Sequence, residues 1–171
     1  MSERDHILQD VLKPGLRIIF CGTAAGTVSA ARGAYYAHPQ NKFWRILFDV
    51  GLTPRLLKPS DYWEVLEFGI GLTDIAKHVS GMDRELPSGS LGNAACAALT
   101  AKIEAAQPKL LAFTSLTAGR RFLGCAAGFG DSDHRIGSTR VWLLPSPSPT
   151  ASWNWSAHEH WWRRLAEEAG R

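Results

Sequence analysis

The sequence predicts an α/β domain in which helices cover both faces of a mostly parallel sheet. Short apolar runs alternate with helical segments along the 171 residues, as in folds where a helix crosses back over the sheet after each strand. The apolar runs lack the polar alternation of a half-exposed strand, so we expect both faces of the sheet to be buried. The length fits a single domain over residues 1–171.

The expected strands are short apolar runs that turn-forming residues end. Gly22 ends the first run and Pro145 ends the last, since proline cannot donate a backbone hydrogen bond within a sheet. The four expected strands are residues 17–21, 69–73, 109–114 and 139–144.

The expected helices begin at capping residues. Pro59 lies in the first turn of the second helix, and Ser115 or Thr114 is placed to cap the fourth. Ser156 and Glu159 have the spacing of a capping box at the start of the last helix. The five expected helices are residues 43–51, 61–67, 91–106, 116–127 and 156–169.

Composition and charge narrow the class of protein. Hydrophobic residues make up 45% and charged residues 20% of the chain, a balance that argues against a disordered or coiled-coil protein. No apolar run approaches the roughly 18 residues of a membrane helix, and we expect no signal peptide at the charged N-terminus. A net charge of +3 permits an acidic partner such as nucleic acid.

The chain shows no sign of a disulfide framework or a metal site. Cys21, Cys96 and Cys125 are odd in number and scattered, so we expect a cytoplasmic location in a reducing, bacterial-type cytosol. His158 and His160 are an i, i+2 pair, which does not share one face of a helix. We therefore expect no metal and no cofactor.

Three loops of unusual composition follow expected strands: residues 22–41, 73–90 and 145–155. Ligands of parallel sheets bind outside the carboxyl ends of the strands. We therefore expect these loops to converge on one edge of the sheet and to form the site there.

The first loop opens with a turn of small residues, Gly22-Thr23-Ala24-Ala25-Gly26. Two glycines after a strand let a ligand approach the backbone closely, where amides can donate to a phosphate or a carbonyl. The turn is neither a GxGxxG motif nor a P-loop, so an ordinary strand-to-helix turn is the alternative.

The same loop continues into a segment of aromatic and polar residues, 35–44. Tyr36 offers a ring on which a base can stack, and Asn41 offers an acceptor and two donors that orient a water or read a base edge. His38 either donates to a substrate oxygen or stays neutral and caps a backbone group. We expect Phe43 and Trp44 in the core.

The last loop alternates proline with small hydroxyl residues from Pro145 to Pro149. Such a segment continues neither a strand nor a helix. A stiff loop loses little entropy when it presses against a partner; the alternative is a proline-rich turn without such a role.

Together these segments resemble the signature segments of the uracil-DNA glycosylase superfamily, nearest its mismatch-specific uracil/thymine and hypoxanthine-DNA glycosylase branches. The resemblance runs from about residue 17 to residue 164, and its most specific part is the Ala-His-Pro-x-Asn-x-Phe-Trp segment. It implies a three-layer α/β/α fold with a central mostly parallel sheet. It also implies hydrolytic removal of a damaged base that is flipped out of DNA, without metal or cofactor. The three segments are residues 22–26, 36–44 and 144–148.

The resemblance implies roles for individual positions. Tyr36 matches the aromatic residue that stacks under the flipped base, and Asn41 matches an asparagine used in catalysis by the hypoxanthine branch. The turn that holds Gly22, Thr23 and Ala24 matches the loop that contacts base and sugar and positions the attacking water.

Two further segments match regions that contact DNA. The loop from Ser146 through Pro147, Ser148 and Pro149 matches the one that presses the minor groove, and Ser115 precedes a helix whose start meets phosphate. His38 and Ser146 are also candidates to stabilise the leaving base, because donors aimed at developing charge are worth several kcal/mol in a dry site.

Three regions depart from the pattern of the family. Ala24 stands where the mismatch-specific branch has an asparagine and other branches have an aspartate, and alanine neither orients nor deprotonates water. Thr150 and Ala151 are small where the family has a bulky wedge, for which Trp153 is a candidate replacement. Leu116 replaces a lysine often found at the start of the phosphate-contacting helix.

Two residues are candidates for the role that Ala24 does not fill. Asn41 orients water without removing its proton, which is sufficient when the water attacks late. Asp74 follows an expected strand end, where a carboxylate acts as a base and stabilises a cationic sugar. The alternative role of Asp74 is a helix N-cap.

The sequence therefore predicts a monofunctional glycosylase that excises uracil, or a related deaminated base such as xanthine or hypoxanthine, from DNA. We expect a monomer that does not act at a membrane. The first alternative is a damaged-base or DNA-binding protein of the same fold with weak or no hydrolytic activity. The second is an α/β protein that binds a small molecule.

Overall fold

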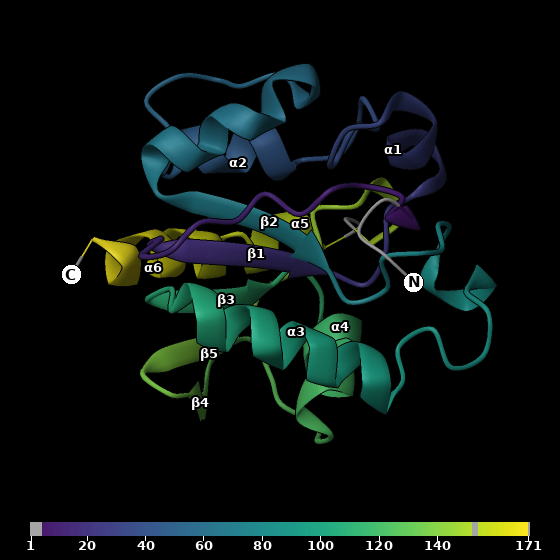
Figure 1. Ribbon diagram of the computed structural model, residues 1–171. Helices are drawn as coiled ribbons and strands as arrows, with labels where there is room; N and C mark the ends of the chain where they lie inside the picture. The colour runs from purple at the N-terminus through teal and green to yellow at the C-terminus, as the bar shows by residue number, and fades with distance from the viewer. Residues whose placement is uncertain (1–4, 152–153, 171) are drawn as a thin grey trace.

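The computed structural model describes residues 5–151 and 154–170, and its centre is a five-stranded sheet (Figure 1). The spatial order of the strands is β2-β1-β3-β5-β4, and β4 runs antiparallel to β5 while the other pairs are parallel. The strands are β1 (Ile18–Gly22), β2 (Ile70–Asp74), β3 (Leu110–Phe113), β4 (Gly130–Ile136) and β5 (Thr139–Leu143).

The central strands are apolar because both faces of the sheet are covered. Every residue of β1, β2 and β3 is buried. The register pairs Gly22 with Asp74 and Phe113 with Leu143, so the carboxyl ends of four parallel strands meet at one edge.

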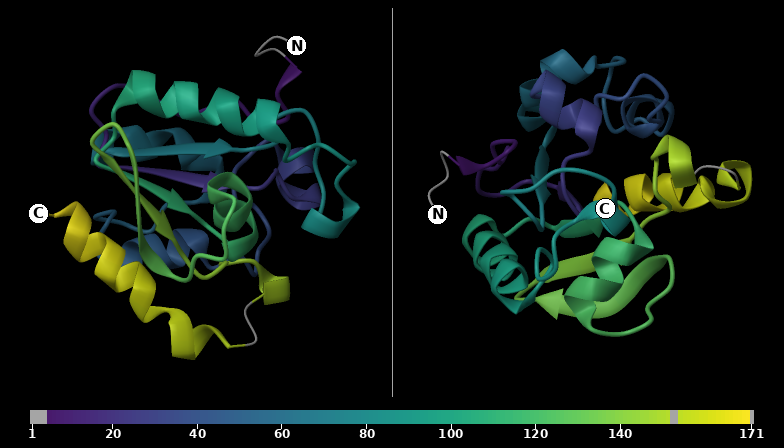
Figure 2. Two further views of the ribbon diagram at one scale, coloured as in Figure 1. Left: turned by 90° about the horizontal axis from the view of Figure 1, so that it is seen from below. Right: turned by 90° about the vertical axis from the view of Figure 1, so that its right-hand side faces the viewer.

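Helices lie on both faces of this sheet, which makes the three-layer α/β/α arrangement (Figure 2). The helical segments are α1 (Thr27–Arg32), α2 (Phe43–Asp49), η2 (Pro59–Phe68), η3 (Asp83–Glu85), α3 (Asn93–Ala106), α4 (Leu116–Leu123), η4 (Pro149–Ala151), α5 (Trp155–His158) and α6 (His160–Ala169). Successive residues of β1 point to opposite faces of the sheet and belong to two hydrophobic cores. Ile18 and Phe20 pack with α2 and α6, and Ile19 and Cys21 pack with α3 and α4.

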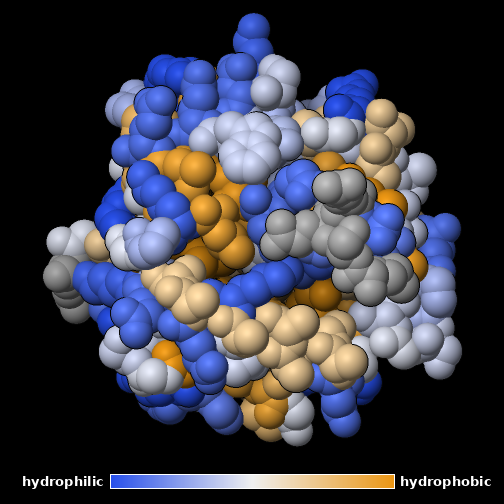
Figure 3. All heavy atoms as spheres, in the orientation of Figure 1, coloured by the Kyte–Doolittle hydropathy of each residue, from blue (hydrophilic) through white to orange (hydrophobic). Residues whose placement is uncertain are grey.

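The outer face of α3 is built from small residues. Leu99 and Ile103 of this helix are buried against the sheet. Alanines occupy much of its exposed side, seen as a pale orange band across the lower half of Figure 3, where Figure 1 places α3. Among the described residues, no helix combines the length and the apolar character that crossing a membrane requires.

All four expected strands are present, with bounds that shift by one residue. The strand β4, which carries Asp131, Asp133 and Arg135 and is partly exposed, was not expected from the sequence. This strand lies at the edge of the sheet and its register shifts between Asp131 and Arg135. An edge strand tolerates charged residues that a central strand excludes, so its sequence lacks an apolar signal.

Two helices differ from their expected limits. The helix expected over residues 116–127 ends at Leu123, because Gly124 adopts a left-handed φ of 70°. The segment expected as a helix over residues 61–67 is the 3-10 helix η2, with a kink at Asp61.

The C-terminal helix and the first loop also differ from expectation. The capping box expected at Ser156 is wrong, because α5 begins at Trp155 after Asn154 and a second helix, α6, begins at His160. The loop expected over residues 22–41 contains the short helix α1.

Candidate functional site

One large cavity, of about 800 Å³, opens at the carboxyl edge of the sheet. Parts of the loops at residues 22–41, 73–90 and 145–155 line it together with the start of α4. Within the part of the chain that the structure describes, every residue that the sequence predicts for the site lines this one cavity. These residues are Gly22, Thr23, Ala24, Tyr36, His38, Asn41, Asp74, Ser115, Ser146, Pro147, Ser148 and Pro149.

Asp74 ends β2 and lies against the glycine turn. A Cβ atom built on Gly22 would stand 2.7 Å from the Asp74 carboxylate and 3.6 Å from the hydroxyls of Tyr36 and Thr114. The carboxylate accepts a hydrogen bond from the backbone of Gly22. The missing side chain at Gly22 therefore makes the space in which these three polar groups meet.

Asp74 is a buried acid with an altered ionisation. Burial raises its pKa to about 6 from an ordinary value of 3.8, and the ammonium of Lys77 opposes that rise. Residues 75–82, all of which the structure describes, contain no helix, so Asp74 is not a helix N-cap. With this pKa, Asp74 is mainly an ionised carboxylate at neutral pH.

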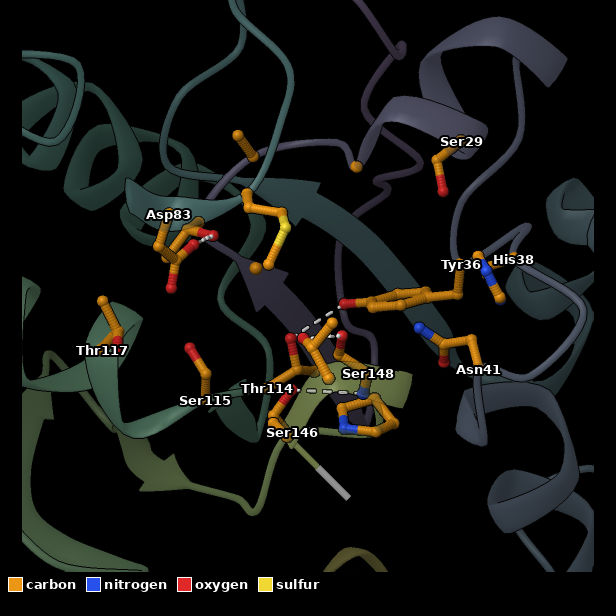
Figure 4. Close-up of a pocket in the computed structure, with 18 of the residues that line it drawn as sticks. Ser29, Tyr36, His38, Asn41, Asp83, Thr114, Ser115, Thr117, Ser146 and Ser148 are labelled. Carbon is orange, nitrogen blue, oxygen red and sulfur yellow. Dashed lines mark hydrogen bonds between the residues drawn. The ribbon is translucent and has the colours of Figure 1, made fainter. Parts of the chain in front are cut away.

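Tyr36 forms part of the cavity wall through its ring. Phe43 covers one face of this ring, with centroids 3.8 Å apart and planes 19° apart. The hydroxyl lies 3.0 Å from that of Thr114 (Figure 4). Burial raises the pKa of Tyr36 well above its ordinary value, so the phenol stays neutral.

His38 and Asn41 each have their acceptor atom occupied by a nearby backbone N–H. Gln40 donates to Nδ1 of His38 at 3.1 Å, and Phe43 donates to Oδ1 of Asn41 at 2.9 Å. A neutral imidazole that accepts at Nδ1 carries its proton on Nε2. Both side chains therefore present N–H donors, and Figure 4 shows the amide nitrogen of Asn41 directed into the cavity.

The proline loop is held in place by hydrogen bonds to its backbone. Lys42 N–H donates to the carbonyl of Pro147 at 3.0 Å, and the indole N–H of Trp162 donates to that of Pro145 at 3.0 Å. Ser146 Oγ accepts from the backbone of Ser148 at 3.2 Å. These contacts fix the loop to the start of α2 and to α6.

The start of α4 forms another wall. Ser115 is its N-cap, and Oγ of Ser115 accepts from the backbone N–H of Ala118 at 3.1 Å. The remaining free amides of the first helical turn face the same end of the helix. The expected cap at this position is confirmed.

The loop expected over residues 73–90 also reaches the cavity through residues 81–84, none of which the sequence identifies individually. Gly81 N–H donates to the carbonyl of Ala25 at 2.9 Å, and the hydroxyl of Thr23 donates to the carboxylate of Asp83. These contacts join residues far apart in the chain. No local sequence pattern signals them.

The tryptophan-rich C-terminal segment contributes only in part. Trp162 is fully buried, and Trp153, the candidate wedge, lies outside the described residues. His158 and Phe129 line the cavity, with ring centroids 5.2 Å apart. The sequence offered no signal for these two rings.

The cavity gathers hydrogen-bonding groups rather than metal ligands. Its carboxylates are those of Asp74 and Asp83, and Thr23 already binds the second. Across residues 5–151 and 154–170, no three His, Cys, Asp or Glu side chains lie close enough to share an ion.

Comparison with known proteins gives a family and a fold. The model of the uracil DNA glycosylase superfamily matches residues 9–168. Among solved structures, the solution NMR structure of a protein from Methanosarcina acetivorans, whose own assignment as a uracil DNA glycosylase is provisional, has a TM-score of 0.67. The match covers 96% of this chain and 97% of that chain at 18% identity, so this second likeness concerns the fold alone.

Proposed function

Because the chain belongs to the uracil DNA glycosylase superfamily, we propose that it excises uracil, or a related deaminated base, from DNA by hydrolysis of the N-glycosidic bond. One observation carries the proposal. A single cavity at the carboxyl edge of the sheet holds an aromatic wall, two N–H donors and one buried carboxylate. Those are the groups that binding and hydrolysing a flipped nucleoside require.

Tyr36 and the two donors suit a base that carries carbonyl oxygens. A flipped base stacks on the ring of Tyr36, a contact worth about 1–3 kcal/mol. Deamination replaces an exocyclic amino group, a donor, by a carbonyl oxygen, an acceptor. The N–H groups of His38 and Asn41 donate hydrogen bonds to such a carbonyl oxygen. Against an amino group they would place donor against donor, which is unfavourable.

Asp74 is the group that we assign to the water. An amide is too weak a base to take a proton and a carboxylate is not, so Asn41 serves the base and Asp74 accepts the proton of the water. The water oxygen bonds to C1′ as the C1′–N bond breaks, and the electron pair of that bond leaves with the base. Donors near the base stabilise its developing negative charge, and the carboxylate stabilises the cationic sugar.

The remaining groups hold the DNA. In this proposal the stiff loop from Ser146 to Pro149 presses the minor groove, and the capped start of α4 at Ser115 meets a phosphate. The turn from Gly22 to Ala24 contacts base and sugar through its backbone. Flipping costs a few kcal/mol, least for a mispaired base such as uracil opposite guanine.

The proposal is tested by release of free base from a duplex with one uracil opposite guanine. We expect release by the wild type, and a loss of about 10²-fold or more in single-turnover rate for Asp74→Asn. Asn41→Ala is expected to slow release and Tyr36→Ala to weaken DNA binding. Asp133→Asn, which removes an exposed carboxylate on β4, is the matched control.

The same assay decides between the enzyme and the alternative. Tight binding of the uracil duplex by the wild type without release of base would favour a DNA-binding protein without hydrolytic activity. Duplexes with hypoxanthine or xanthine in place of uracil identify the preferred base.

We further propose that the protein acts as a monomer in a bacterial-type cytosol. Its cysteines, Cys21, Cys96 and Cys125, are free thiols, which fits a reducing compartment. Light scattering with and without DNA checks the oligomeric state.

A further inference from the structure

A second cluster of polar groups lies beyond the cavity wall and is centred on Asp10. One carboxylate oxygen of Asp10 accepts from Lys77 Nζ at 2.8 Å and from the Thr73 hydroxyl at 2.6 Å. The other accepts from Lys102 Nζ at 2.6 Å. The Lys77 side chain is only 6% exposed, and a lysine is rarely so buried without charged partners.

Lys77 is connected through Tyr35 to the next residue, Tyr36, whose ring is the stacking wall of the cavity. Its ammonium donates to the Tyr35 hydroxyl at 3.0 Å, and that hydroxyl donates to the carbonyl of Gln9 at 2.9 Å. Trp44 Nε1 donates to the carbonyl of Tyr35 at 3.1 Å. Tyr35 is thereby held at its side chain and at its backbone.

Tyr36 needs such support because its backbone is strained. It has a φ of 51°, in the left-handed region that residues other than glycine rarely adopt. Such conformations persist when the surrounding structure over-determines them. The anchors on Tyr35, one residue earlier, meet that need.

Lys77 is also connected to Asp74 through the chain. It follows Asp74 by three positions. Two hydrogen bonds join the backbone between them to the glycine turn: Ile75 N–H donates to the carbonyl of Gly22 at 2.9 Å, and Ala76 N–H donates to the carbonyl of Thr23 at 2.8 Å. The end of β2 and the Lys77 ammonium are thus parts of one hydrogen-bonded unit.

The cluster around Asp10 is positively charged. Two ammonium groups, Lys77 and Lys102, face the one carboxylate of Asp10, and burial, together with the charge of Lys77, lowers the pKa of the neighbouring His6. Burial raises the pKa values of Cys21, Tyr35 and Tyr36, so these groups stay neutral. The titratable and charged groups around Asp74 are Asp10 from the N-terminal segment, Cys21 from β1, Tyr35 and Tyr36 from the loop before α2, Lys77 after β2 and Lys102 from α3.

We infer that Lys77 is a positioning residue of the site: its buried ammonium, bound by Asp10 and Tyr35, is the counter-charge of the Asp74 carboxylate and an anchor of the stacking wall. The catalytic meaning of this inference rests on the role proposed for Asp74. The effect of Lys77 on the ionisation of Asp74 does not depend on that role, because it is a property of the free protein.

The test compares Lys77→Met with Lys102→Met. Both variants remove one ammonium from Asp10, which keeps the Thr73 hydroxyl and the other lysine, so we expect both to fold. Only Lys77 also bonds Tyr35, and it acts on Asp74 more strongly than Lys102 does. The readout is the titration midpoint of the Asp74 carboxyl carbon, measured by NMR in the free protein and assigned with Asp74→Asn.

We expect Lys77→Met to move this midpoint upward by roughly half a unit or more, because an opposite charge that favours the ionised form is lost. Lys102→Met should move it less. Lys77→Gln, which keeps a donor to Asp10 and removes the charge, is the second variant if Lys77→Met does not fold. An unchanged midpoint, or an equal shift in both lysine variants, would overturn the inference.

The excision assay supplies the second arm. If the wild type excises base, the acid limb of its pH profile should move upward in Lys77→Met together with the NMR midpoint. If the wild type excises nothing, the proposed function fails while the NMR arm still decides the role of Lys77.

Discussion

At Gly22, a hydrogen atom stands where any other residue would place a carbon 2.7 Å from the Asp74 carboxylate. The backbone there is ordinary extended strand, so the requirement for glycine comes from the side chain opposite rather than from φ. The absence of a side chain at Gly22 therefore decides where the carboxylate of Asp74 lies.

Gly22→Ala is expected to fold and to lose excision. The added Cβ displaces the carboxylate of Asp74, and misplacing a reacting group by about 1 Å costs on the order of 10²-fold in rate. Single-turnover excision of uracil, with thermal unfolding measured on the same sample, separates lost chemistry from lost fold.

Gly26→Ala is the matched control within the same turn. A Cβ there meets nothing within 4 Å, and Gly26 has an ordinary φ of −67°. Excision by this variant should stay close to that of the wild type. Equal losses in both variants would mean that the turn matters for its flexibility and not for the room it leaves for Asp74.

At the scale of single elements, α4 depends on its cap. Ser115→Ala removes the hydrogen bond to Ala118 and should lower the free energy of unfolding by about 1 kcal/mol. Urea unfolding measures the change. Thr117→Ala, in the same first turn but without a capping role, should change stability little; a larger loss at Thr117 would contradict the assignment of the cap.

The elements that the sequence predicts correctly are those whose residues are selected by burial. Residues 17–21 and 109–114 are apolar because both faces of the central strands are covered, so their composition alone identifies them. β4 was missed because an edge strand with Asp131 and Arg135 satisfies those side chains in solvent or in ion pairs. The break between α5 and α6 was missed because no proline or glycine marks it.

The candidate site likewise has features that the local sequence reveals and features that only the folded structure determines. Tyr36, His38 and Asn41 lie within one short segment, so the sequence reveals them together. The contact of Tyr36 with Thr114 spans 78 positions and depends on the strand order, which no local pattern encodes. The donor character of His38 and Asn41 depends on which backbone N–H reaches each side chain, and that is a property of the folded loop.

For the molecule as a whole, burying the carboxylate that the proposed chemistry uses lowers the stability of the fold. The carboxyl edge of the sheet brings three distant loops together, and Asp74 is the acid buried beneath them. A group whose folded pKa, about 6, exceeds its ordinary value of 3.8 stabilises the fold when protonated. This contribution is fully present below pH 3.8 and is lost as the pH rises through 6.

Asp74→Asn is therefore expected to lose excision and gain stability. At pH 8 the ionised carboxylate costs the fold about 3 kcal/mol, since each unit of pKa shift corresponds to about 1.4 kcal/mol. Asparagine removes that charge and keeps an oxygen for the backbone of Gly22. The gain should shrink as the pH falls toward 4, where Asp74 of the wild type is protonated in the fold.

Urea unfolding of both proteins at pH 8 and pH 4.5 measures this difference. The comparison must be between the two proteins, because Asp10 and Asp131 have lowered pKa values and stabilise the fold increasingly as the pH rises. A variant that is less stable than the wild type at pH 8 would mean that the positive charge of Lys77 and Lys102 outweighs the burial of the carboxylate. The ionised carboxylate of Asp74 would then stabilise the folded protein, and the site would carry no cost in stability.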